Sequence, residues 1–284
     1  MALIEEERNR IIIQRKFWYN RVFVVLELVK CLQHRELSFL TAKEEDKSKL
    51  RMRQLFCERY DFWKLITEQL GFQEKLVNAY RSVATYKPDT IPLSSLNLYR
   101  RLDSEAYQKF NENFGENIAD YDFLIDLDSE SFSDAYYQAS VIKSVFDDYK
   151  LPYSFWNSSS KGFHFVIEGK YFDIPLLNKP NAFAKVSYNL KGIYELKGID
   201  TEIFDFRRIV KLPYSFNCGD STIVLPLSDE NFEKDLKIHL NKYLTSNSVL
   251  NRIMIKNRGL LTRNLDLSEE QLEAKCKKFI KDFG

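Results

Sequence analysis

The stretch YDFLIDLDSE, residues 121–130, most constrains how this chain can fold, because it carries an apolar run directly into two acids. A β-strand points successive side chains to opposite faces, so the pattern predicts one apolar face and one acidic face. Asp126 and Asp128 share the acidic face, while Ile125 and Leu127 share the apolar one. Same-face neighbours lie about 6–7 Å apart, where two carboxylates repel unless a cation separates them. The pattern indicates either a strand that runs out into solvent or a site for a divalent metal.

The composition fits a globular protein and narrows the class further. The chain has 284 residues, of which 44% are hydrophobic and 29% are charged, which is ordinary for a globular chain with a sizeable core. Its 42 Lys and Arg against 41 Asp and Glu give a net charge of +1, so any surface for nucleic acid must be local. The four cysteines show no C-x2-C spacing, and no zinc is predicted. The charged N-terminus and the short apolar runs favour a cytoplasmic protein without a membrane partner.

The order of helical and strand patterns predicts an α+β fold. Apolar runs without Gly or Pro predict helices over residues 3–33 and 43–70. Short alternating runs after about residue 77 predict strands at 77–86, 122–128, 153–157, 163–168 and 221–226. Further helices are predicted at 133–150, 231–243 and 268–282. We expect a helical N-terminal region at 1–75 that packs on a core at 76–284, within one compact domain overall.

A second polar cluster lies in NSSSKGFHFVIEG, residues 157–169. A serine-rich turn with Lys161 and Gly162 leads into a strand that carries His164. Hydroxyls, backbone N–H groups, a lysine and a histidine around a glycine turn are suited to hold phosphate. A polar β-turn with one satisfied histidine would have the same pattern, so the stretch alone leaves both interpretations open.

A third cluster lies in GIDTEIFDFRRIVKLPYSFN, residues 198–217. Two acids, Asp200 and Asp205, are followed by three basic residues, Arg207, Arg208 and Lys211. Such a set could complete a metal site that also binds a polyphosphate. A solvated helix face with i,i+3 or i,i+4 ion pairs is the alternative.

The three clusters in this order resemble the archaeo-eukaryotic primase (AEP) superfamily, especially the small catalytic subunit of primase. The family motifs are a strand that ends in D-x-D, an S-x-x-[RK]-G-x-H element, an apolar residue before Asp, and [RK]-x-P-x-S-x-H. Here they read LIDLD, SSSKGFH, ID at 199–200 and KLPYSFN at 211–217. QHRELSFL at 33–40 and AYRSVATY at 79–86 are similar to two further elements of that subunit. The resemblance covers about residues 33–230 and implies an RRM-like mixed β-sheet core with a helical N-terminal portion.

The resemblance implies a catalytic site with two metal ions, Mg²⁺ or Mn²⁺. Asp126 and Asp128 align with the first two metal ligands. Asp200 is the expected third ligand, because it follows an apolar residue and has close to the family's spacing from Pro213. Asp205 is the alternative, because it matches a second acid that some archaeal members carry.

The resemblance also implies a set of nucleotide-binding residues. Lys161 takes a position where a basic phosphate ligand is usual, and Asn217 stands where the family commonly has histidine. Asparagine can donate a hydrogen bond but carries no charge, which puts the affinity for triphosphate in doubt. The zinc element common in primase small subunits is absent from the sequence. The complete expected set is Ser158, Lys161, His164, Lys211, Asn217 and Arg208.

The implied function is that of a DNA primase or primase-polymerase, which joins NTPs or dNTPs on a single-stranded DNA template. Expected protein partners are a large accessory primase subunit or other replication, repair or defence proteins. Two alternatives stay open. A strand that ends in D-x-D also occurs in metal-dependent nucleotide-sugar glycosyltransferases, and a catalytically degenerate relative could serve as a nucleic-acid-binding subunit.

Overall fold

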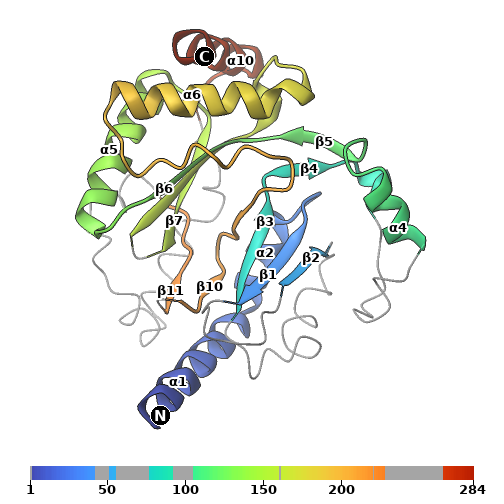
Figure 1. The fold of residues 1–284 in the computed structure, drawn as a ribbon, viewed down its shortest axis with the longest axis vertical. Helices are drawn as coiled ribbons and strands as arrows, with labels where there is room; N and C mark the ends of the chain where they lie inside the picture. The colour runs from blue at the N-terminus through green and yellow to red at the C-terminus, as the bar shows by residue number, and fades with distance from the viewer. Residues whose placement is uncertain are drawn as a thin grey trace. The chain divides into compact units, whose positions relative to one another are not determined.

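The structure is a computed structural model that describes residues 2–41, 51–55, 77–91, 105–159, 161–219, 221–227 and 265–284 (Figure 1). Contacts between Cα atoms divide the chain into two compact units. Unit 1 comprises Met1–Ala119, Ile209–Leu225 and Asp235–Lys256. Unit 2 comprises Asp120–Arg208, Pro226–Lys234 and Asn257–Gly284. Within the described ranges, no helix has the length and apolar character that crossing a bilayer requires.

Unit 1 is built on an antiparallel sheet with the strand order β2-β1-β3-β9. These strands span Arg51–Leu55 (β2), Leu37–Thr41 (β1), Val77–Ser82 (β3) and Ile209–Lys211 (β9). The helices α1 (Ala2–Tyr19) and α2 (Val22–Cys31) precede the sheet in the chain. The remaining elements of this part are β4 (Ala84–Tyr86), η2 (Pro88–Thr90), α4 (Glu105–Glu112), β10 (Phe216–Asn217) and β11 (Thr222–Ile223). Strand β5 (Ile118–Tyr121) begins in unit 1 and ends in unit 2.

Two aromatic side chains attach α1 to the turn that follows β9. The indole of Trp18 donates a hydrogen bond to the carbonyl of Tyr214 (2.8 Å), and the Tyr19 hydroxyl accepts one from the backbone N–H of Phe216 (2.9 Å). Both aromatic rings are buried. Burial of a tryptophan or tyrosine costs little when its polar atom finds such a partner. These two bonds therefore allow the end of α1 to pack in the core of unit 1.

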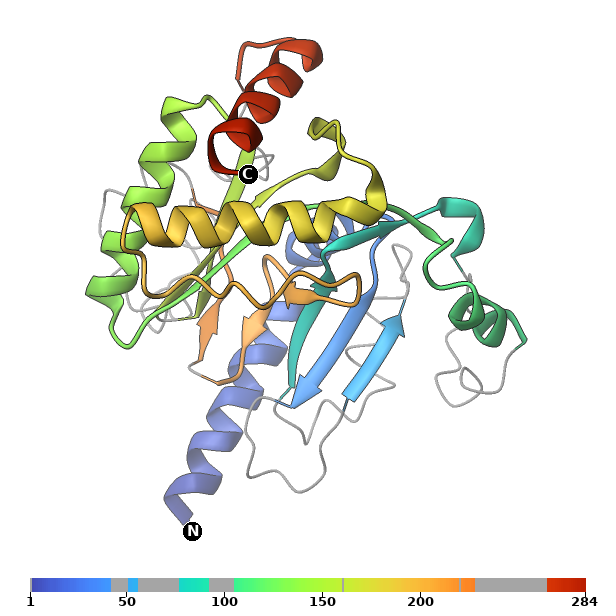
Figure 2. The same ribbon diagram turned by 45° about the horizontal axis from the view of Figure 1, so that its top comes forward.

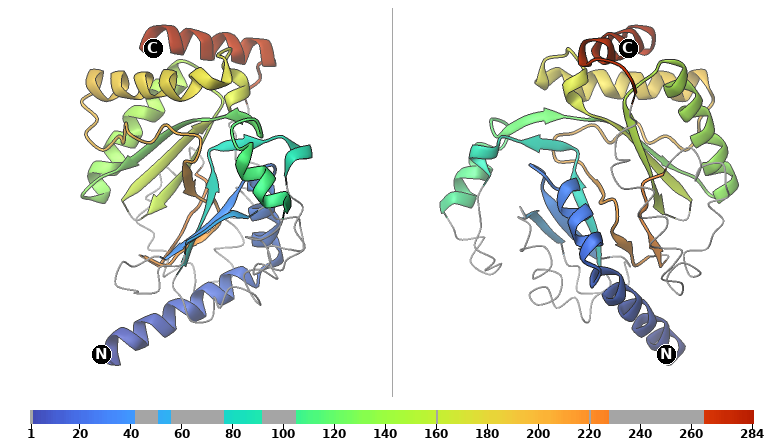
Figure 3. Two further views of the ribbon diagram at one scale, coloured as in Figure 1. Left: turned by 45° about the vertical axis from the view of Figure 1, so that its right-hand side comes forward. Right: turned by 180° about the vertical axis from the view of Figure 1, so that it is seen from behind.

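Unit 2 contains a second antiparallel sheet, with the order β6-β8-β7. Its strands span Phe123–Asp128 (β6), Gly162–Ile167 (β8) and Tyr153–Ser159 (β7). The helices of this unit are α5 (Phe132–Asp148), α6 (Lys179–Ile193) and α10 (Glu269–Phe283), with short 3-10 turns η4 (Gly169–Tyr171) and η5 (Leu176–Asn178). Figures 2 and 3 show the three helices gathered on one side of this sheet.

Phe123 lies at the centre of the core of unit 2. Its ring centroid is 6.3 Å from that of Phe146 on α5, 5.2 Å from Phe183 on α6 and 5.9 Å from Phe279 on α10. One strand residue therefore contacts all three helices, which fixes the face of β6 that they cover. Side chains at even positions of β6 point to the opposite face.

The α+β fold class predicted from the sequence is confirmed. The strands predicted at 122–128, 153–157 and 163–168 correspond to β6, β7 and β8 within two residues, and α5 and α10 lie where helices were predicted. The strand predicted at 77–86 is divided into β3 and β4. That predicted at 221–226 is reduced to Thr222–Ile223.

Three other secondary-structure predictions need correction or fall outside the described residues. The helix predicted over 43–70 is wrong at Arg51–Leu55, which forms β2, and the predicted helical region at 1–75 also contains β1. Short strands of this kind depend on pairing with β1 rather than on intrinsic preference. Helix α6 was not predicted, because it begins with Lys-Pro and contains Asn and Gly. The helix predicted at 231–243 lies outside the described residues, and the domain boundary near residue 75 stays a prediction.

Candidate active site

The pairing register of β6 and β8 aligns two sequence motifs side by side. Asp126 lies opposite His164, and Asp128 lies opposite Gly162. Asp126 and Asp128 are two residues apart on β6, as Gly162 and His164 are on β8. A single register therefore aligns both cross-strand pairs on one face of the sheet. Along β6, Leu127 is fully buried while Asp126 is partly exposed and Asp128 is exposed, which confirms the alternation predicted from the sequence.

Gly162 allows two polar side chains to approach each other over the strand. A Cβ atom at this position would collide with the Oδ1 atom of Asp128 and the Oγ atom of Ser158. Any larger residue would therefore displace one of them. The glycine of the SSSKGFH stretch thus has a steric role beside the acids, in addition to forming a turn.

Residues 198–200, which we call the Asp200 segment, pair with the end of β6 on its free edge. The backbone N–H of Asp128 donates to the carbonyl of Gly198, and that of Asp200 donates to the carbonyl of Asp126, both at 3.0 Å. Between these bonds, Ile199 lies opposite Leu127. A Cβ atom on Gly198 would collide with the backbone carbonyl of Asp128. The glycine therefore lets the segment approach closely and brings Asp200 beside Asp126.

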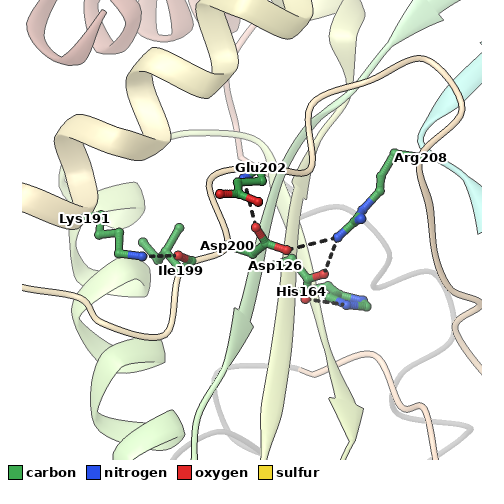
Figure 4. A network of polar contacts seen from close by, with 7 residues as sticks. All are labelled: Asp126, His164, Lys191, Ile199, Asp200, Glu202 and Arg208. Atoms are coloured by element: carbon green, nitrogen blue, oxygen red, sulfur yellow. Dashed lines mark hydrogen bonds and ion pairs between the residues drawn. The ribbon is translucent and has the colours of Figure 1, made fainter.

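Arg208 and His164 surround the Asp126 carboxylate (Figure 4). One guanidinium nitrogen of Arg208 is 3.3 Å from Oδ2 of Asp126 and 3.3 Å from Oδ2 of Asp200. The Nε2 atom of His164 is 3.1 Å from Oδ1 of Asp126. Burial by itself would raise the pKa of the Asp126 carboxyl, but the imidazole and the guanidinium together hold that pKa below its usual value. Asp126 is therefore a carboxylate at neutral pH.

The His164 ring is held by its neighbours in the sheet. It is buried, and it meets the ring of Trp156 on β7 edge-on, with 5.7 Å between the centroids. Its Nδ1 atom has no hydrogen-bond partner among the residues that the structure describes, and the same holds for the buried Oγ atom of Ser158. Buried polar atoms are usually paired, so these two are available to a bound group.

Asp205, the alternative third acid, has a different environment from Asp200. Its Oδ1 atom accepts a hydrogen bond from the backbone N–H of Arg207 (2.7 Å), and its carbonyl accepts one from Arg208 (3.0 Å). Asp205 therefore shapes the turn from which Arg208 extends. Asp200, in contrast, shares the guanidinium of Arg208 with Asp126.

The other predicted nucleotide-binding residues fall in different places. Lys161 is exposed in the turn between β7 and β8, and its Nζ atom is 3.4 Å from the carbonyl of Glu130. Lys211 and Asn217 belong to unit 1, on β9 and β10. Asn217 is buried, and its Oδ1 atom accepts a hydrogen bond from the N–H of Gly219 (3.1 Å). The contacts predicted for these three residues with a nucleotide stay predictions.

Asp126, Asp128 and Asp200 are the candidate ligands for the divalent metal that the sequence resemblance implies. In the described part of the chain, no three Asp, Glu, His or Cys side chains are gathered as a metal-binding group. Asp126 and Asp200 nevertheless converge on one cationic nitrogen of Arg208, and Asp128 is two residues from Asp126 on the same face. Carboxylate oxygens are the ligands that Mg²⁺ and Mn²⁺ prefer. The donor set fits these ions, with Arg208 as the group that an ion would displace.

The chain shares its fold with a solved polymerase domain. By structure, the chain is similar to the polymerase domain of ligase D from Mycobacterium tuberculosis, solved in complex with DNA. The TM-score is 0.52 at 12% sequence identity, and the match covers 85% of this chain and 89% of that domain. At this identity the likeness establishes the fold and leaves the activity open.

Two further solved structures match with TM-scores too low to support an argument. The AEP domain of the cyanophage S-2L primase-polymerase has a TM-score of 0.41 at 12% identity, over 74% of this chain and 89% of that one. The catalytic domain of primase RepB′, in complex with initiator DNA, has a TM-score of 0.40 at 11% identity, over 84% and 97%. No protein-family model and no curated protein matches the chain.

Proposed function

We propose that this protein is a metal-dependent nucleotidyltransferase that starts or extends a nucleic-acid strand on a single-stranded DNA template, using NTPs or dNTPs. One observation carries the proposal. The β6–β8 register places Asp126 beside His164 on the face that also carries Asp128, and Arg208 contacts the carboxylates of both Asp126 and Asp200. The similarity to a polymerase domain solved with DNA supports this choice of reaction.

In this proposal Asp126, Asp128 and Asp200 hold the metal ions. Bound Mg²⁺ or Mn²⁺ would activate the attacking 3′-hydroxyl and neutralise charge on the pyrophosphate leaving group. The two carboxylates that Arg208 now bridges would exchange it for metal, and the freed guanidinium could then pair with a phosphate oxygen. Asp205 is kept as the alternative third ligand.

Ser158, Lys161 and His164 would bind the triphosphate in this scheme. The hydroxyl of Ser158 has no partner among the described residues, so donating to a phosphate oxygen would satisfy it. The Nδ1 atom of His164 would donate to a phosphate oxygen in the imidazolium form of the ring, in which both nitrogens carry a proton. The opposite nitrogen of His164, Nε2, lies 3.1 Å from Oδ1 of Asp126. Lys211 and Asn217 are proposed as further phosphate ligands on the family resemblance alone.

The test is primer synthesis on single-stranded DNA, with labelled NTPs or dNTPs and with Mg²⁺ or Mn²⁺. We expect labelled oligonucleotides from the wild-type protein and none from the double variant Asp126→Asn/Asp128→Asn. Asp173→Asn, at an exposed acid of unit 2, is the matched control and should keep full activity. Equal product from the double variant and the wild type would refute the proposal.

The same assay separates the alternative functions. A glycosyltransferase would consume labelled UDP-sugars with metal and leave the dNTPs unchanged. A degenerate subunit would bind single-stranded DNA without metal-dependent binding of a nucleoside triphosphate. Either outcome would replace the proposed function.

A further inference from the structure

The Asp200 segment pairs with β6 through a single bridge, between Ile199 and Leu127. It bonds β6 through two backbone hydrogen bonds, from Asp128 to Gly198 and from Asp200 to Asp126. Neighbouring residues of a strand present their backbone groups to opposite sides. The carbonyl of Ile199 therefore points away from β6 and needs a donor from elsewhere.

Lys191, in the last turn of α6, supplies that donor. Its Nζ atom is 2.8 Å from the carbonyl oxygen of Ile199 (Figure 4). The side chain is half-buried, and the contact spans only eight residues of sequence. A charged donor strengthens such a bond compared with a neutral one. Lys191 thus attaches the outer edge of the Asp200 segment to α6.

Gln138 on α5 holds the start of the same segment. Its Oε1 atom accepts a hydrogen bond from the backbone N–H of Gly198 (2.8 Å). Its Nε2 atom donates to the Oγ atom of Ser129 (3.1 Å) and to a carboxylate oxygen of Asp134 (2.8 Å). Gln138 is buried, at 4% exposure. The amide therefore joins the end of β6, just after Asp128, to the beginning of the segment that carries Asp200.

We propose that Lys191 and Gln138 are positioning residues that set the place of Asp200 relative to Asp126, and thereby the metal affinity of the site. The inference rests on the proposed function. The bonds of Lys191 and Gln138 to the Asp200 segment go to backbone atoms of Ile199 and Gly198. Each side chain therefore acts on Asp200 through the backbone. If the bond from Lys191 is lost, Ile199 is free to shift, and Asp200 shifts with it. Removal of residues that orient metal ligands typically lowers metal affinity by about 10- to 100-fold.

The experiment measures Mn²⁺ binding by calorimetry or electron paramagnetic resonance, without nucleotide or turnover. Lys191→Met keeps most of the side-chain volume but removes the donor, and we expect its Kd for Mn²⁺ to rise about 10-fold or more. Lys191→Arg keeps a charged donor and should recover most of the affinity. Gln138→Met removes the acceptor for Gly198 independently and should also weaken binding.

Two control variants separate positioning from a loss of general stability. Lys185→Met changes an exposed lysine of the same helix and should leave the Kd unchanged. Asn189→Ala removes a hydrogen bond from α6 to the carbonyl of Phe283 (2.8 Å), so it should lower the midpoint of thermal unfolding without changing the Kd. Binding is compared at a temperature where all the variants are folded.

The possible outcomes distinguish this inference from the function on which it rests. Wild-type protein that binds no Mn²⁺ would overturn the proposed function and this inference together. Wild-type binding that is equal in Lys191→Met and Gln138→Met would overturn only the inference. The same would follow if Asn189→Ala weakened binding as much as Lys191→Met.

Discussion

Ser82 in the sheet of unit 1 has its hydroxyl bonded within the protein, whereas Ser158 and His164 in the β6–β8 sheet each keep one buried polar atom without a hydrogen-bond partner among the described residues. Ser82 on β3 accepts a hydrogen bond from the N–H of Glu36 (3.0 Å) and donates to the carbonyl of Ala84 (2.6 Å). Arg35 donates to the carbonyls of Ser82 and Val83, at 3.2 and 2.7 Å. These bonds join the two stretches QHRELSFL and AYRSVATY.

The corresponding residues of unit 2 are arranged differently. Ser158 and His164 are buried, as is Ser82, yet the Oγ atom of Ser158 and the Nδ1 atom of His164 have no hydrogen-bond partner within the described ranges. Burial of a polar atom without a partner costs stability, about 1–3 kcal/mol for each group. A buried hydroxyl that both accepts and donates within the protein, like that of Ser82, stabilises the fold, whereas the buried hydroxyl of Ser158 is available to a ligand.

The largest expected effect comes from the carboxylate that Arg208 and His164 both contact. Asp126→Asn should lower the proposed rate of nucleotidyl transfer by about 1,000-fold, or about 4 kcal/mol, because the site would lose charge that the proposed metal ions require. Steady-state primer extension measures the rate, and circular dichroism checks the fold. A rate within about a factor of two of the wild-type rate would show that the Asp126 carboxylate has no catalytic role.

Substitution at Gly162 should have the next largest effect. Gly162→Ala would push the added methyl group against Asp128 and Ser158, and such a displacement can lower kcat/KM by about 100-fold. Gly192→Ala is the matched control, because a Cβ atom at that position in α6 meets nothing within 4 Å. Equal kcat/KM for the two variants would show that the close approach has no role in catalysis.

Ser82→Ala, in unit 1, should lower the stability of the protein without lowering its activity. The variant leaves the N–H of Glu36 and the carbonyl of Ala84 without their partner, so the free energy of unfolding should fall by about 1–3 kcal/mol. The kcat of the folded protein should stay at the wild-type value. Urea denaturation and steady-state kinetics measure the two quantities. Thr90→Ala, which loses an exposed bond to the Lys87 carbonyl, should change the unfolding free energy less. A fall in kcat without a fall in stability would contradict the structural role.

The smallest effect concerns the dependence of stability on pH. The pKa of Asp126 is lower in the folded protein than the ordinary value of 3.8. The stability that its ionisation contributes is therefore present above that ordinary value and is lost as the pH falls through the lower pKa of the folded state. Urea unfolding between about pH 2 and pH 5 should show a steeper loss of stability for the wild type than for Asp126→Asn. Parallel curves would mean that Arg208 and His164 do not stabilise the ionised carboxylate.

Much of unit 2 could be predicted from local patterns. The alternation of FLIDLD predicted β6 and its acidic face, and GFHFVI predicted β8 in the same way, because each strand buries one face and its side chains repeat every two residues. The third acid was harder to choose, because spacing along the chain allows both Asp200 and Asp205. The edge pairing between Gly198 and Asp128 is what brings Asp200 to Asp126. No local pattern predicts this pairing.

The sequence by itself determined which residues alternate on β6 and β8 and which motifs the chain carries. Only the tertiary structure decided the register that aligns Asp126 with His164, and the support of the Asp200 segment by Lys191 and Gln138. The physical reason is that side-chain alternation is a local property of the backbone. Register and edge pairing, in contrast, depend on hydrogen bonds between residues far apart in sequence.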